Sequence, residues 1–379
     1  MRMRAIAVGT VIGVLIGGLI VALLGTRHLW RVPAAPLQED GGQITRVVMQ
    51  YQPEAGPLVA PIYRQFLTAL GKDAEVVWVV GQADDLADLH TRLGTAWPVK
   101  HREVVVGKSI TTWAKDRFVA MRALDGRELA VSCAPVRTRS PNPLRRNDQE
   151  VPYHLARTFA KLFGVRGATV DFDGGDFLAT ADHLFAGPGI YAKNATQSPS
   201  AITQHLADIL SHPVTWLGDP GTTPPHHLGM FLTVIGHTAA VGDVRQAEAL
   251  AATHPDIRHA LQAADGPATP AFRADLQTRL DHVARQLRSL GYTVVRVPLF
   301  PSATPRAWMS YNNGIVDTRN GKTIFYMPTF GSPTLDTAAA SSFKAQLHCE
   351  VIPIDCAAIW PLGGSLHCLV NVVGRTEEK

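Results

Sequence analysis

Five short segments place a nucleophilic, acid–base or hydrogen-bonding side chain where an apolar run ends or turns. Three of the four intervals between these residues are 54 to 57 residues long. This spacing predicts one functional residue per structural unit, with the units arranged in a pseudo-symmetric ring. The five residues are Asp116 in WAKDRF, Asp173 in DFDGGDF, His227 in PPHHLGMFL, Asn313 in SYNNG and Cys368 in GGSLHC.

A cysteine, a histidine and two carboxylates in one site can perform covalent catalysis, because the histidine moves protons while a thiolate attacks carbon. Each residue also has a simpler explanation. Cys368 can be an apolar core residue, DFDGGDF a tight turn or a source of calcium ligands, and Asp116 half of a surface ion pair. His226 and His227 follow two prolines and can be loop residues. The sequence has no CxxC and no repeated His/Cys spacing, so no metal or other cofactor is predicted.

Short β-rich runs alternate with helical stretches, which predicts an α/β fold. The chain has 379 residues, 46% of them hydrophobic, enough for a large core. The basic segment 137–146 is predicted to be an exposed loop, and Cys349 can pair with Cys356 if the domain faces an oxidising compartment. The predicted strands are 44–51, 75–80, 103–107, 292–300, 350–356 and a final one containing Cys368; the helices are 61–70, 151–164, 200–211, 271–291 and 336–347; residues 168–180 form a strand-turn-strand, and 226–243 and 312–328 form hairpins.

Together the five segments resemble those of the guanidino-group-modifying (pentein) superfamily, which includes arginine, agmatine and peptidylarginine deiminases, dimethylarginine hydrolases and amidinotransferases. WAKD is similar to the family's WxxD, DGGD to its EGGD or EGGN turn, HLGMFL to HxDxFL, SYNN to SYxN and GGSLHC to GGxxHC, all in the family's order. The resemblance covers roughly residues 43–375. It implies five ββαβ-type units around a central channel, a five-bladed α/β propeller with pseudo-fivefold symmetry.

The resemblance also implies a chemistry. Cys368 would attack the guanidine carbon to form a covalent amidino-thioether, and His227 would act as acid and base. Asp116 would bind the guanidinium, and Asp173 would orient His227. The substrate would be a small guanidine or an arginyl peptide, and no cofactor is implied. The predicted substrate-binding residues are Trp113, Asp176, Asn313 and Gly364.

One position departs from the family pattern. The second carboxylate of HxD corresponds to Gly229. Removing one partner of a buried charge costs about 3–5 kcal/mol. Either Asp176 or Asp219 fills the gap, or the substrate is less basic or is handled by amidino transfer, or the domain binds a ligand without catalysis. The first prediction is a hydrolase of guanidine or amidine C–N bonds; an amidinotransferase and a non-catalytic, membrane-anchored binding domain are the alternatives.

The N-terminus carries a targeting signal. Residues 5–25 contain 21 positions without a charge, which as a helix span about 30 Å, the thickness of a bilayer core. We expect residues 1–31 to form a single-pass membrane anchor, 32–42 a linker and 43–379 one catalytic domain on the extracytoplasmic side; a cleaved signal peptide is the alternative. The net charge of +4 is too small to predict a nucleic-acid partner, and no feature indicates the oligomeric state.

Overall fold

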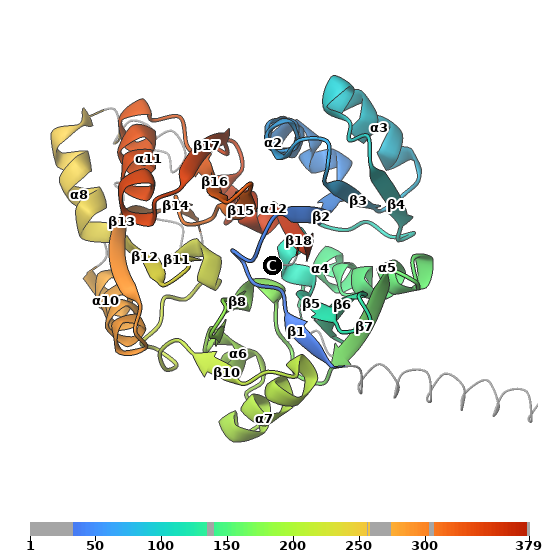
Figure 1. Ribbon diagram of the computed structural model, residues 1–379, viewed down its shortest axis with the longest axis horizontal. Helices are drawn as coiled ribbons and strands as arrows, with labels where there is room; N and C mark the ends of the chain where they lie inside the picture. Colours follow the sequence, from blue (N-terminus) through green and yellow to red (C-terminus); the bar gives the residue numbers. More distant parts are fainter. Residues whose placement is uncertain (1–32, 135–139, 256, 258–273, 303–306, 377–379) are drawn as a thin grey trace, which may run out of the picture.

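The computed structural model describes residues 33–134, 140–255, 257, 274–302 and 307–376, which form a mixed α/β structure. Within this part of the chain the strands form five small sheets around a common centre, with the longer helices on the outside (Figure 1). Each sheet contains an antiparallel pair of strands, and one strand of the pair also pairs in parallel with a third strand. The described chain therefore repeats one local pairing scheme around the centre.

One sheet joins the two ends of the described chain. Its last strand in the sequence, β18, pairs antiparallel with β2, so the residues after the cysteine segment are fixed to the first half of the protein. β2 and β3 are rich in valine and buried along most of their length, as expected for inner strands of a covered sheet. The elements of this sheet are β18 (Val370–Arg375), β2 (Ile44–Tyr51), β3 (Glu75–Val80) and β4 (His101–Val105), with helices α2 (Gly56–Leu70) and α3 (Asp84–Leu93).

The other four sheets follow in chain order. The first contains β1 (Ala34–Pro36), β5 (Val119–Ala123), β6 (Glu128–Cys133) and β7 (Phe163–Ala168), with α4 (Pro143–Asp148) and α5 (Val151–Thr158); the second β8 (Phe177–Ala179), β9 (Leu184–Ala186) and β10 (Val214–Trp216), with α6 (Gly189–Lys193) and α7 (Pro199–Leu210). The third contains β11 (Leu232–Ile235), β12 (Thr238–Asp243), β13 (Thr293–Pro301) and β14 (Trp308–Ser310), with α8 (Val244–Thr253) and α10 (Ala274–Ser289); the fourth β15 (Ile315–Arg319), β16 (Lys322–Thr329) and β17 (Glu350–Asp355), with α11 (Pro333–Leu347).

Strand and hairpin predictions with strong local signals are confirmed. β2 and β3 have the predicted bounds, and the two predicted hairpins are the pairs β11–β12 and β15–β16. The second hairpin turns at Asn320 and Gly321, both with positive φ (51° and 72°). Asn and Gly tolerate this left-handed backbone conformation, which explains why the dipeptide marks a tight turn.

Two helix boundaries were predicted wrongly. α2 begins at Gly56, and Pro61 lies inside it rather than at its start. Pro57 lies in the first turn, where proline is well tolerated, so the helix begins there. Pro61 removes one hydrogen bond from the helix interior, and the burial of one helix face compensates for this loss. The helix predicted over residues 151–164 ends at Thr158, because Phe163 and the residues after it pair with β6 instead.

The segment 32–42, predicted to be a linker, is part of the fold from residue 33 onward. β1 pairs with β5, and Glu39 and Gly42 accept buried hydrogen bonds from Arg375 through their backbone carbonyls. The proline and glycine content of this segment is typical of a linker, but its contacts with residues far away in the sequence hold it in the fold.

Two predictions about cysteines also differ from the structure. Cys368 lies on the short helix α12 (Leu366–Leu369), two residues before β18 begins, rather than inside a strand. Cys349 and Cys356 are free thiols, so the conditional disulfide is absent.

The predicted membrane anchor, residues 1–31, lies outside the described residues. Among the helices that the structure does describe, none is both long enough and apolar enough to cross a bilayer. The anchor at residues 5–25 therefore stays a prediction of the sequence.

Candidate active site

Asp116 lies on a tight turn that is fixed to the strand after the cysteine. The amide of Asn371, on β18, donates to the carbonyls of Ala114 (3.4 Å) and Phe118 (3.1 Å), on either side of Asp116. Asp116 is buried, with 4% of its surface exposed. The turn that carries this carboxylate is thus held in place by the same strand that follows Cys368.

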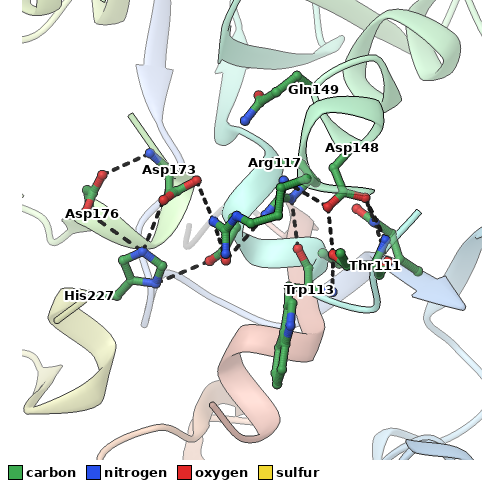
Figure 2. Close-up of polar contacts among 12 residues, drawn as sticks. Thr111, Trp113, Arg117, Asp148, Gln149, Asp173, Asp176 and His227 are labelled. Atoms are coloured by element: carbon green, nitrogen blue, oxygen red, sulfur yellow. Dashed lines mark hydrogen bonds and ion pairs between the residues drawn. The ribbon is translucent and has the colours of Figure 1, made fainter. Parts of the chain in front are cut away.

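A buried arginine, Arg117, forms an ion pair with Asp116. Arg117 is fully buried, with its guanidinium 3.3 Å from Asp116 Oδ2 and 3.1 Å from Asp148 Oδ2. Its Nε donates to the carbonyl of Trp113, and Thr111 donates twice to Asp148 (Figure 2). Each charged group in this chain of contacts has an oppositely charged neighbour, which offsets part of the cost of burying it.

The DGGD segment is a turn packed against both Asp116 and His227. Asp173 and Asp176 form a reciprocal capping box, in which the Asp173 N–H donates to Asp176 Oδ2 at 2.9 Å. A Cβ on Gly174 would lie 2.3 Å from the carbonyl of Lys115, and one on Gly175 would lie 2.7 Å from His227 Nδ1. Only glycine allows the turn, the Asp116 loop and the imidazole to approach this closely.

His227 lies among three carboxylates. Its Nδ1 is 3.3 Å from Asp116 Oδ1, and its Nε2 is 3.5 Å from Asp173 Oδ2 and 3.9 Å from Asp176 Oδ1 (Figure 2). Burial opposes the charged imidazole, but Asp116, Asp173, Asp176 and a contact with Cys368 outweigh it and raise the pKa of His227 well above its ordinary value. The site therefore holds His227 as an imidazolium, ready to donate a proton.

Cys368 lies within interaction range of His227. It is 5% exposed, and a Cβ on Gly364 would lie 3.0 Å from its Sγ and 2.9 Å from the ring of Trp113. Asn313 organises the loop between them: its Oδ1 accepts from Ser365 N (3.0 Å) and Oγ (2.9 Å), and its carbonyl accepts from His367 N. The structure thus shows that Asn313 supports the cysteine loop, and its predicted contact with substrate stays a prediction.

Two cations in the site were missed by the sequence analysis. Arg145 Nη2 lies 3.3 Å from Asp116 Oδ2 and 2.9 Å from Asp173 Oδ1, and Lys193 Nζ lies 2.9 Å from Asp173 Oδ2 and 2.5 Å from Asp176 Oδ2. Burial alone would raise the pKa of Asp173, but Lys193, His227 and Arg145 hold it well below its usual value. The three carboxylates nearest His227 therefore already have cationic partners.

Arg145 was predicted to lie in an exposed loop, and that prediction was wrong. Residues 143–148 form α4, with Pro143 in the first turn and the Asn142 side chain accepting from the Leu144 N–H. Asn followed by Pro is a helix-start signal, and it was available in the sequence. What the sequence does not show is that this helix directs one arginine toward Asp116.

The position of the absent second carboxylate is occupied by an imidazole. A Cβ on Gly229 would lie 2.8 Å from His367 Nδ1. Neither acidic residue suggested as a replacement fills this position: Asp219 is exposed in a turn with Thr222, and Asp176 pairs with Lys193. Among the described residues no group of three His, Cys, Asp or Glu side chains is arranged to hold a metal ion.

The comparisons with known proteins identify the family. The family model of the Porphyromonas-type peptidyl-arginine deiminases matches residues 46–372. The chain belongs to this family. It is an enzyme of the deiminase type within the guanidino-group-modifying superfamily, as the sequence motifs predicted. No curated protein matches the sequence.

Solved structures agree with the fold. The agmatine deiminase of C. jejuni is 15% identical, with a TM-score of 0.65 over 90% of this chain and 97% of that one. A cysteine-to-serine variant of that enzyme with substrate bound is 14% identical, with a TM-score of 0.64 over 91% and 98%. The agmatine deiminase of Enterococcus faecalis is 16% identical, with a TM-score of 0.60 over 89% and 95%. At these identities the likeness establishes the mixed α/β fold of the pentein deiminases.

Proposed function

We propose that this enzyme hydrolyses a C–N bond of a guanidine substrate through a covalent adduct on Cys368. One observation carries the proposal: Asp116 and Asp173 hold a guanidinium, that of Arg145, beside His227. Carboxylates placed to bind a planar cation next to an acid–base group and a thiol suit a guanidine better than a peptide carbonyl. We also infer that the five repeated sheets form the five-bladed, pseudo-symmetric propeller that the motif spacing predicted.

The proposed reaction has two halves. In the first, the Cys368 thiolate forms a bond to the guanidine carbon, and the C–N bond to the departing amine breaks as His227 gives that nitrogen its proton. In the second, His227 takes a proton from water, the oxygen attacks the amidino carbon, and the C–S bond breaks to return the thiolate. The products are ammonia and a ureido compound. The His227 imidazolium and its three carboxylates suit the first half.

The proposal is tested by measuring whether the full-length chain turns over members of a panel of guanidine compounds. Agmatine, arginine and arginyl peptides are incubated with the enzyme, ammonia and ureido product are measured, and the intact protein is weighed to detect an amidino adduct. Turnover of one substrate class supports the proposal and names the class. An adduct that is discharged only when an amine acceptor is added would instead support amidino transfer. If no compound of the panel is turned over and no adduct forms, the proposal is overturned.

Arg145 occupies the place of a substrate guanidinium, so the substrate must displace it. A tethered competitor acts at an effective concentration on the order of mM. Replacing Arg145 by glutamine is therefore expected to lower KM for the preferred guanidine by about tenfold or more, with a small effect on kcat. Steady-state kinetics check this.

The matched control is Arg146→Gln. The Arg146 side chain is exposed and donates to the carbonyls of Ser140 (2.8 Å) and Pro141 (2.9 Å), away from the carboxylates. It is expected to leave KM unchanged. If Arg145→Gln raises KM instead, Arg145 contributes to substrate binding rather than competing with it.

We further propose that residues 5–25 anchor the enzyme in a membrane with the catalytic domain on the extracytoplasmic side. The length of this uncharged run supports the proposal. Pelleting of the full chain with membranes, but not of a chain that lacks the run, tests the anchor; equal behaviour of the two would contradict it.

A further inference from the structure

The imidazole of His367 lies where a side chain at position 229 would project. A Cβ on Gly229 would be 2.8 Å from His367 Nδ1 and 3.1 Å from its Cε1. Gly229 is two residues from His227 in the chain, and His367 directly precedes Cys368, so this contact joins the two segments that carry the groups of the proposed reaction. A side chain at position 229 would require the His367 ring to move, so the ring can take this place because residue 229 is glycine.

The other ring nitrogen of His367 contacts a partly buried carboxylate. His367 Nε2 lies 3.2 Å from Glu39 Oε2, and Glu39 Oε1 accepts from Lys115 Nζ at 2.7 Å. The Glu39 side chain has 14% of its surface exposed. Glu39 comes from the segment that was predicted to be a linker, and it precedes residues 46–372, which the family model matches. This contact is therefore an addition of the N-terminal segment to the site.

The contact determines the tautomer of the imidazole. A carboxylate can only accept, so the hydrogen of a neutral His367 resides on Nε2 and points at Glu39, which leaves a lone pair on Nδ1. Within the described chain no hydrogen bond is found to Nδ1, which faces Gly229. The Nδ2 of Asn313 is buried and unpartnered among the described residues, and it too lies near Gly229, 3.6 Å from the added Cβ. Two unused polar atoms of the described chain thus lie close to Gly229.

We propose that Glu39 fixes His367 in the tautomer whose Nδ1 accepts a hydrogen bond from a guanidine N–H, in place of the carboxylate that position 229 lacks. The inference rests on the proposed function. It makes His367 a substrate-binding residue and Glu39 a positioning residue that acts through it. A neutral acceptor then stands where the family pattern has its second carboxylate, so binding relies less on charge than it would with a carboxylate at position 229.

Two replacements of His367 separate this role from packing. The amide oxygen of asparagine reaches the place of Nδ1, whereas that of glutamine reaches the place of Nε2. His367→Asn is expected to keep KM within about threefold of the parent. His367→Gln is expected to raise KM by about ten- to a hundredfold, the range for a lost hydrogen bond to a charged group, with a smaller effect on kcat.

A change at Glu39 tests the positioning role. In Glu39→Gln, Lys115 can only donate and so takes the amide oxygen, which leaves the amide N–H₂ facing His367 Nε2. The imidazole must then accept at Nε2 and carry its hydrogen on Nδ1. KM is expected to rise as in His367→Gln. The rise is expected to disappear when Glu39→Gln is combined with His367→Asn, because the asparagine oxygen is an acceptor whatever residue stands at position 39.

Binding is measured separately from turnover. Agmatine and arginine are titrated calorimetrically into each variant in a Cys368→Ala background, and thermal unfolding checks that each variant is folded. Weaker binding in His367→Gln than in His367→Asn supports the inference even if the panel shows no turnover, in which case only the proposed function fails. Equal binding in the two folded variants, or no binding in either, overturns the inference whether or not the enzyme turns over guanidines.

Discussion

Turnover of guanidine substrates is expected to fall by on the order of 10⁶-fold when Cys368 is replaced by alanine, the scale of loss for removing the nucleophile from a cooperating catalytic unit. The amidino adduct is expected to vanish with it, while agmatine binding persists, because Asp116 and its supports do not depend on the thiol. Steady-state assays, the mass of the intact protein after a substrate pulse and calorimetry measure the three effects.

Cys349→Ala is the matched control. Cys349 is also a free and buried thiol, but it lies in the core by α11, where it donates to the Phe343 carbonyl, and burial raises its pKa to about 11. It is expected to keep full activity and to form the adduct. Turnover that survives in Cys368→Ala would mean that another group attacks the guanidine carbon.

Replacing His227 by alanine is expected to lower kcat by about 10²- to 10⁴-fold, the usual contribution of a positioned acid–base group. The wild-type enzyme is expected to lose kcat/KM on the alkaline side, as the imidazolium loses its proton at a pKa well above the ordinary 6.5. His227→Ala should show no such alkaline limb, and pH profiles of kcat/KM for both proteins check this.

The Asp173→Asn variant tests the direction in which Asp173 shifts the pKa of His227. Removing a carboxylate this close lowers a neighbouring pKa by about 1–3 units, so the alkaline limb is expected to move to lower pH. Because the folded pKa of His227 is raised, its ion pairs stabilise the fold fully below pH 6.5 and lose that contribution as pH rises through the folded pKa. Thermal unfolding should show this loss at alkaline pH in the wild type. A limb that moves to higher pH would contradict the assignment.

The carboxylates of the site are balanced by cationic side chains, and this pairing affects how a substrate can bind. Three carboxylates face His227, and Arg145, Lys193 and Arg117 pair with them. Under the proposed function, a guanidinium substrate enters by exchanging with a resident cation rather than by filling an empty anionic pocket. This exchange limits the binding energy available to the ground state, and membership of an enzyme family favours catalysis over the binding-domain alternative that Gly229 raised.

The sequence by itself determined the order and identity of the groups that can do chemistry. WAKD, DGGD, HLG and GGSLHC are local patterns, the last three with glycine close to a functional side chain, and such patterns can be recognised without knowing the fold. The valine-rich strands β2 and β3 and the Asn320–Gly321 turn were equally legible, because alternation, burial and backbone conformation are properties of adjacent residues. For these features, local physics dominates.

Only the tertiary structure decided which distant residues complete the site. Arg145 reaches Asp116 across 29 positions and Glu39 reaches His367 across 328, and nothing local to either residue specifies its partner. The same holds for Gly229, read from the sequence as a missing carboxylate and found in contact range of an imidazole. Charge pairing and close packing are set by which surfaces the sheets bring together, so these contacts exist only once the strands have closed around the centre.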